Sequence, residues 1–220
     1  MTTEMRNLPL FPLHTVLFPG ATIPLQIFED RYKKMINYCL ESDSMFGIVL
    51  IKEGDEVGGP AIPHNVGTVA KITNTREISG GRIYISVLGT KRFRINEIVQ
   101  DTPYLVAEVE VGEPEDDPYI PEDELSSIKK ATSEYVEHLL SIRGGWATDT
   151  PTPPNPVELS YFLAQLLQID MTKRQDILGN NSCRDRLDAC KKYLEQANAS
   201  LSIQTRLEVN LKSVSYTHLT

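Results

Sequence analysis

The stretch LPLFPLHTVLFPGATIPLQIFEDRYKKMINYCL, residues 8–40, decides how the rest of the chain must fold. Proline fixes φ and lacks a backbone N–H, so Pro9, Pro12 and Pro24 divide the apolar run into edge pieces or strand starts. Pro19-Gly20 is typical of a turn, because glycine adopts the positive φ that a type II turn needs. The alternation of apolar residues over 23–27 then predicts a half-buried strand, and an apolar helical face begins after Glu29 and Asp30.

Residues 45–111 continue with short runs of alternating or β-branched residues. Val66–Ile78 predicts a long strand after a polar loop at 52–65, and Ser79-Gly80-Gly81 has the chemistry of a hairpin turn. Gly89-Thr90 predicts an interruption before the strand that carries Phe93 and Ile95. About six strands with one early helix indicate a curled, mainly antiparallel sheet or small β-barrel.

The pattern becomes helical after an acidic, proline-containing segment. Nine acidic residues and no basic one lie between Glu108 and Glu124, so residues 113–121 are predicted to link two subdomains, 1–112 and 122–212. Helices are predicted from 125 to 140, after Pro156, from 172 to 178, and from Ser182 to about Lys212. The last helix could form a coiled-coil dimer. Residues 213–220 carry no apolar stripe, and we expect them to be a cloning remnant. The chain is thus predicted to be α+β, with a helical bundle after the sheet.

Composition limits the function. The net charge of −8 makes nucleic acid an unfavourable main partner, since phosphate binding draws on excess Lys and Arg. The histidines and the three cysteines lack zinc-ligand spacing, so no metal or other cofactor is expected. No signal peptide or membrane span is visible, which favours a cytoplasmic protein without membrane contact.

The sequence nominates no catalytic residue. A GxxxxGK[ST] loop and a GxSxG motif are both absent. Cys39 with His14 could form a nucleophile and base, but Cys39 lies on the apolar face of its predicted helix. Glu29 is better explained as a helix cap with an ion pair to Arg31 or Arg92. The basic group around Phe93 is more readily a solvated strand face or a set of internal ion pairs than a nucleic-acid surface.

Several segments carry a family resemblance. LPLFPLHTVLFPGATIPLQIFEDRYKKMI is similar to the opening of the Lon protease N-terminal, or substrate-binding, domain, and VGTVAKI, GGRIYISVLGTKRFRI and PYLVAEVEV resemble its later strands. ELSYFLAQLL and TKRQDIL resemble its helical part. The resemblance covers roughly residues 7–212. It implies a PUA-like β subdomain followed by helices, without the ATPase and the Ser-Lys peptidase that follow in the whole protease.

Three functions remain open at this point, one of them a free-standing hydrolase for which the sequence nominates no residue. Another is a non-enzymatic module that binds unfolded or damaged protein segments or peptides, as an adaptor in protein quality control. Its candidate contact residues are aromatic or apolar, although core positions explain most of them equally well: Leu10, Phe11, Phe18, Phe28, Tyr32 and Trp146. The alternative, an RNA- or small-ligand-binding protein, rests on fold analogy alone.

Overall fold

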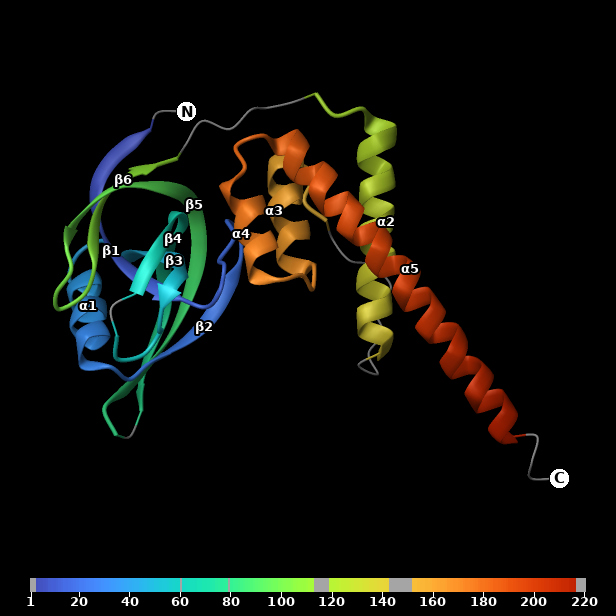
Figure 1. The fold of residues 1–220 in the computed structure, drawn as a ribbon, viewed down its shortest axis with the longest axis horizontal. Coiled ribbons are helices and arrows are strands. Elements are labelled where there is room, and N and C mark those ends of the chain that lie inside the picture. Colours follow the sequence, from blue (N-terminus) through green and yellow to red (C-terminus); the bar gives the residue numbers. More distant parts are fainter. Residues whose placement is uncertain (1–2, 60, 79, 113–118, 143–151, 217–220) are drawn as a thin grey trace.

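In the residues that the structure describes, six strands and five helices form two parts that lie side by side (Figure 1). The structure is a computed structural model that describes residues 3–59, 61–78, 80–112, 119–142 and 152–216. The first part contains β1 (Glu4–Leu13), β2 (Thr22–Ile27), α1 (Asp30–Leu40), β3 (Met45–Gly54), β4 (Ala61–Ile78), β5 (Arg82–Gln100) and β6 (Val106–Val111). The second contains α2 (Glu122–Ile142), α3 (Pro156–Leu166), α4 (Met171–Gly179) and α5 (Cys183–Tyr216).

Five of the strands close into a small barrel. The strand order is β2-β5-β4-β3-β1-β6, and β6 also pairs with β5, which closes the ring and leaves β2 outside it. The pairs are antiparallel except β1 with β3, which run parallel because the chain crosses over through β2 and α1 between them. The predicted α+β class with a curled sheet and a helical bundle is therefore confirmed, and the parallel pair is a feature the sequence did not indicate.

The two longest strands are longer than predicted. β4 already begins at Ala61, so the turn that precedes it is shorter than the predicted loop, and β5 continues through Gly89. The pairing of β4 with β5 shifts register between Thr68 and Ala70. A Cβ at Gly89 would lie 2.4 Å from the Phe18 carbonyl oxygen, so glycine here permits close approach of the opening segment and does not end the strand.

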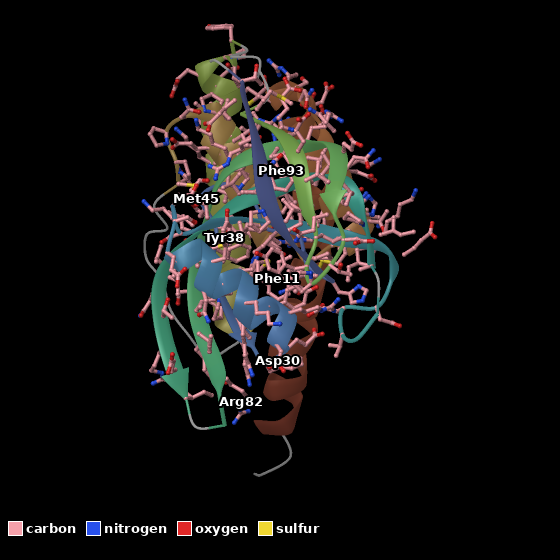
Figure 2. The ribbon with its side chains drawn as sticks, turned by 90° about the vertical axis from the view of Figure 1, so that its left-hand side faces the viewer. Phe11, Asp30, Tyr38, Met45, Arg82 and Phe93 are labelled. Atoms are coloured by element: carbon pink, nitrogen blue, oxygen red, sulfur yellow. The ribbon has the colours of Figure 1, made fainter. Side chains whose placement is uncertain are left out.

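The barrel interior has its own apolar cluster. Every strand of the ring contributes to it, and the Phe93 ring lies so close to β3 and β4 that a Cβ on Gly47 or Gly67 would come within 2.7 Å of its Cζ atom. Figure 2 views this part from the side that α1 covers, with Asp30 and Tyr38 marking the helix and Arg82 the β4–β5 hairpin. The members of the cluster are Leu8, Leu10, Val49, Val69, Phe93, Ala107, Val109 and Val111.

A larger cluster contains buried residues of both parts. Phe18, fully buried, lies with its ring centroid 6.5 Å from that of Tyr161 in α3 and 5.2 Å from the Arg174 guanidinium carbon in α4. β6 ends at Val111 and α2 begins at Glu122, on either side of the predicted linker. Because the core runs from one part into the other, the division into subdomains stays a prediction.

The helix ends follow the sequence closely. Asn155 caps α3 by accepting from the backbone N–H groups of Val157 and Glu158, with Pro156 in the first turn. The Ser182 hydroxyl accepts from the Asp185 N–H at 3.2 Å, as the predicted cap requires. Helix α5 continues to Tyr216, past the end predicted near Lys212, and residues 213–216 are helical. Its distal half extends beyond the other helices in Figure 1.

Candidate functional site

A small apolar hollow lies beside β2, between that strand and the turn that precedes β4. It has a volume of about 140 Å³, enough for a single side chain and well below the size of a pocket for a drug-sized ligand. Phe11 and Tyr32 lie against each other at its base, with ring centroids 4.2 Å apart. Phe28 and Val57 line it and are 49% and 56% exposed, so apolar surface stands open to a partner. We call this the inner hollow.

Ionic contacts hold the side of the inner hollow in place. The Arg31 Nε atom donates to Glu29 at 3.0 Å, and the Arg31 guanidinium also donates to the carbonyls of Gly59 and Glu56. Glu29 in turn accepts from the Gly58 N–H at 3.3 Å. These contacts fix the 56–59 turn against the start of α1, which keeps the hollow preformed.

The predicted contact residues separate into exposed and buried sets. Of the predicted contact residues that the structure describes, only Phe28 is exposed, whereas Leu10 and Phe18 are fully buried, so these two cannot contact a partner in this state. Phe11 and Tyr32 are 6% and 5% exposed and serve as the floor of the hollow. Trp146 lies outside the described residues.

The ion-pair predictions are partly corrected. Glu29 and Arg31 form the expected pair, but the Glu29 side chain makes no capping hydrogen bond to the helix it precedes. Arg92 lies far from this pair in the fold. It is 2% exposed and donates to the carbonyls of Leu178 at 2.8 Å and Asn180 at 2.9 Å, so it joins β5 to the end of α4. Its position on a strand that faces the helices, which the sequence did not indicate, explains the difference.

A second hollow lies on the outer face of the sheet, on the other side of β2. It has a volume of about 390 Å³ and is lined by Pro24, Asn74, Thr75, Arg76, Tyr84, Ile85 and Ser86. The Arg76 guanidinium carbon lies 5.9 Å from the Tyr84 ring centroid, and the Tyr84 hydroxyl hydrogen-bonds Gln26 at 3.0 Å. We call this the outer hollow. Pro24 lines both hollows.

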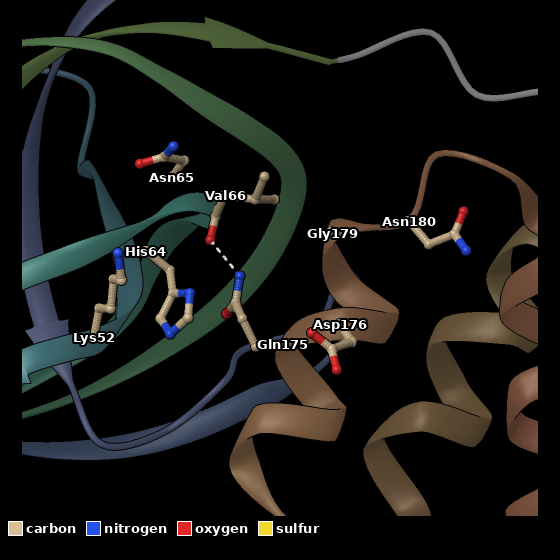
Figure 3. A pocket seen from close by; sticks show the side chains of 8 residues that line it. All are labelled: Lys52, His64, Asn65, Val66, Gln175, Asp176, Gly179 and Asn180. Carbon is tan, nitrogen blue, oxygen red and sulfur yellow. Dashed lines mark hydrogen bonds between the residues drawn. The ribbon is translucent and has the colours of Figure 1, made fainter.

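A polar cleft of about 480 Å³ lies where the barrel meets α4 (Figure 3). Lys52, His64 and Asp176 bring charged and titratable groups to it. Burial, with the Lys52 charge, lowers the pKa of His64, and Asp176 only partly opposes this. Gln175 donates to the Val66 carbonyl at 3.0 Å, and within the described part of the chain its buried Oε1 atom has no hydrogen-bond partner.

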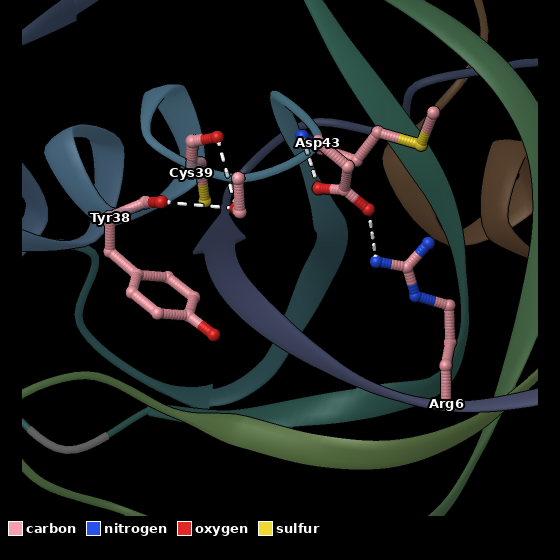
Figure 4. Close-up of polar contacts among 6 residues, drawn as sticks. Arg6, Tyr38, Cys39 and Asp43 are labelled. Carbon is pink, nitrogen blue, oxygen red and sulfur yellow. Dashed lines mark hydrogen bonds and ion pairs between the residues drawn. The ribbon is translucent and has the colours of Figure 1, made fainter.

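Cys39 and Cys190 are poorly suited to nucleophilic catalysis. Burial raises the pKa of the Cys39 thiol to about 12, an effect to which the nearby Asp43 adds and which Arg6 opposes. Burial also raises the pKa of Cys190 to about 12. Both thiols stay protonated near neutral pH, and a thiol reacts only as its thiolate. Figure 4 shows Cys39 on α1, near the turn in which Asp43 receives a hydrogen bond from Arg6.

The described segments also lack two features that would point to other kinds of function. In the described segments, no three His, Cys, Asp or Glu side chains gather in a way that could hold a metal ion. None of the helices, over the same segments, combines the length and apolar character needed to cross a membrane.

The sequence matches one family model over most of its length. The model is described as the ATP-dependent protease La (LON) substrate-binding domain, and it matches residues 7–196. Among curated proteins, the Lon protease of Flavobacterium johnsoniae is 26% identical over 213 residues, which are 94% of this chain and 26% of that protein. Lon protease 2 of Syntrophobacter fumaroxidans is 27% identical, over 96% of this chain and 27% of that protein. The chain thus spans about a quarter of the length of these relatives.

Solved structures give the same result for the fold. The Lon N-terminal domain protein from Xanthomonas campestris superposes with a TM-score of 0.64 at 29% identity, covering 83% of this chain and 95% of that one. The N-terminal domain of the Mycobacterium avium complex Lon protease has a TM-score of 0.58 at 21% identity, covering 86% and 98%. The second likeness concerns the fold alone.

Proposed function

The chain belongs to the substrate-binding domain family of ATP-dependent protease La (Lon), and we propose that it binds exposed apolar segments of unfolded or damaged proteins at the inner hollow. One observation carries the proposal: Phe28 and Val57 are about half exposed beside a preformed hollow whose floor is aromatic. At protein interfaces, the residues that contribute most to affinity are side chains of one partner that become buried in a pocket of the other. A side-chain-sized hollow suits one residue of a polypeptide better than a whole small molecule.

The proposed role is binding without catalysis. The buried, protonated thiols of Cys39 and Cys190 support it, as does the family's substrate-binding description. In a cell, such a module would act in the cytoplasm as an adaptor that delivers or protects substrates. A dimer through α5 also remains a proposal, because side chains beyond residue 199 lie outside those described.

The test is a titration of the purified chain with a labelled, chemically unfolded model protein, followed by fluorescence anisotropy. The change is Phe28→Ser, and Tyr119→Ser is the matched control because Tyr119 is an 84% exposed aromatic before α2, remote from the hollow. We expect Phe28→Ser to weaken binding about tenfold, equal to about 1.4 kcal/mol, and Tyr119→Ser to leave it unchanged. Absent binding, or equal effects of the two changes, would contradict the proposal.

A second candidate is a small polar ligand in the cleft between the barrel and α4. The orphaned Gln175 Oε1 acceptor, with Lys52 and Asp176 at the same cleft, favours it. A screen of charged metabolites by thermal shift, repeated on Asp176→Asn, tests this candidate, because a genuine ligand would raise the melting temperature of the unaltered chain only. RNA binding loses support, because Arg92 is buried and donates to the Leu178 carbonyl, so its charge is not available to phosphate groups. A gel shift at low salt would test RNA binding.

A further inference from the structure

Strand β2 presents a free edge next to both hollows. It stands at the end of the strand order, and within the described segments β5 is its one partner strand, from Thr22 opposite Leu88 to Ile27 opposite Ile83. Among the described residues, no backbone hydrogen bond joins its other side to another segment. An edge strand with unpaired backbone groups is a template on which a further strand can pair.

Pro24 indicates which backbone groups point outward. Proline is tolerated in a strand where its nitrogen faces the open edge, so the backbone groups of Pro24, and of Thr22 and Gln26 two residues away on either side, point away from β5. The edge therefore offers N–H donors from Thr22 and Gln26 and carbonyl acceptors from all three residues. Because Pro24 has no backbone N–H, this edge lacks one hydrogen-bond donor. It therefore favours aggregation through strand pairing less than an edge with all its donors would.

The strand register separates the two faces beside β2. Gln26, Tyr84 and Arg76 are register neighbours and share one face, whereas Ile27 is buried on the other face in the cluster that contains Phe11 and Tyr32. Side chains of a strand alternate between faces, so a chain added beside β2 would direct successive side chains toward the inner hollow and the outer hollow in turn. The inner hollow has an apolar floor of Phe11 and Tyr32. The outer hollow presents the exposed Arg76 guanidinium beside Tyr84. The surface is thus complementary to an extended segment in which apolar and acidic side chains alternate.

We infer that the bound polypeptide adds to β2 as an extra strand, with apolar side chains at the inner hollow and acidic side chains at Arg76. This rests on the proposed function and specifies the occupant: an extended segment of an unfolded protein with two-residue alternation. Backbone pairing gives affinity that tolerates many sequences, and the two hollows give the preference among them.

The first test uses a capped, fluorescein-labelled peptide that alternates valine and glutamate, together with versions methylated at one backbone nitrogen each. Strand addition predicts a two-residue period: methylation at every second position weakens binding about tenfold, and methylation at the positions between has less than about twofold effect. A uniform response to methylation would overturn strand addition while leaving peptide binding intact. If the parent peptide and unfolded protein both fail to bind, the proposed function itself fails.

The second test changes the protein. Arg76→Glu should reverse the preference, so that the peptide alternating valine and lysine binds more tightly than the one with glutamate. Thr22→Pro removes an outward N–H and should weaken binding several-fold, whereas Thr22→Val, which keeps the N–H, should not; melting curves verify that both variants fold. An unchanged preference in Arg76→Glu, or equal binding by the two Thr22 variants, would overturn the inference.

Discussion

Phe18 and Phe28 come from the same opening segment but belong to two regions that differ in kind. Phe18 lies at the junction between the barrel and the helices, fully buried against α3 and α4. Phe28 lies at the margin of the sheet beside β2 and is 49% exposed. The junction also contains buried polar contacts, such as the Thr68 hydroxyl that donates to the Leu17 carbonyl at 2.6 Å. The junction therefore stabilises the fold, whereas the β2 margin leaves apolar surface exposed, which is the basis of the proposed binding surface.

Replacing Phe18 tests the junction with the largest expected effect. Phe18→Ala removes a fully buried ring from the larger core cluster and should lower the free energy of unfolding by about 3–5 kcal/mol. Urea denaturation followed by circular dichroism measures it. A loss below about 1 kcal/mol would mean that the two parts of the chain do not depend on this contact.

Replacing Arg92 tests the hydrogen bonds that join the barrel to the helices at the same junction. Arg92→Met leaves the Leu178 carbonyl without this donor, while the Asn180 carbonyl keeps Arg186 at 2.9 Å, so we expect a loss of about 2–3 kcal/mol. Lys91→Met is the control, because Lys91 is exposed on the same strand and its loss should change stability by less than about 0.5 kcal/mol. Similar urea midpoints for both variants would refute the role of Arg92.

Asp43 adds a smaller, pH-dependent contribution away from both regions. Burial acts to raise its pKa, but the hydrogen bond and charge of Arg6, together with backbone N–H groups that include that of Met45, outweigh burial, and the pKa falls below its ordinary value. A lowered carboxyl pKa stabilises the fold above the unfolded pKa of about 3.9, and this is lost as pH falls through the folded pKa.

Asp43→Asn should therefore lower stability by at most about 1 kcal/mol at neutral pH, since the pair is partly exposed. The difference from the unaltered chain should shrink below about pH 4 and vanish in stronger acid. Urea midpoints measured from pH 7 to pH 2 would show this. A difference that stays constant over that range would exclude the ion pair as its cause.

Replacing Phe28 should give the smallest change in stability, in contrast to the large loss expected on replacing Phe18. Phe28→Ala should alter the free energy of unfolding by less than about 0.5 kcal/mol, because half of the ring is already in water. The same urea experiment as for Phe18→Ala makes the two values directly comparable. A loss above about 1 kcal/mol would place Phe28 among the structural residues and remove the basis for the binding surface.

Local patterns were the part of the fold that sequence could predict. Alternation located β2 and the apolar face of β5, and the Asn155-Pro156 and Ser182 signals located the starts of α3 and α5, because capping depends on residues adjacent in the chain. Pro24 correctly indicated an edge strand. Pro9 and Pro12 suggested edges too, but β1 has two neighbours, with Pro9 in the half that pairs with β6 and Pro12 in the half that pairs with β3.

The candidate site could be predicted only in part. Phe28 was nominated as a contact candidate and lies at the surface, but its role in binding stays a prediction. The Glu29–Arg31 ion pair could be predicted because the two residues are close in the chain. Val57, which is 56% exposed, was missed because it lies in a segment that is polar on average. The available sequence signal was a lone valine among glycines and acidic residues. Its approach to β2 depends on the Arg31 contacts with the 56–59 turn, which no local pattern encodes.

The amino-acid sequence by itself determined where most strands lie, though not the full length of β4 and β5, and it determined two helix starts, the acidic segment and the family resemblance, because each follows from neighbouring residues. Only the tertiary structure decided which aromatic residues are buried. Leu10 faces the barrel interior and Phe18 the helices, whereas Phe28, with the same apolar chemistry, remains at the surface. The reason is physical: burial is set by which distant segments pack together, and closure of the ring between β5 and β6 excludes β2 and leaves its edge free.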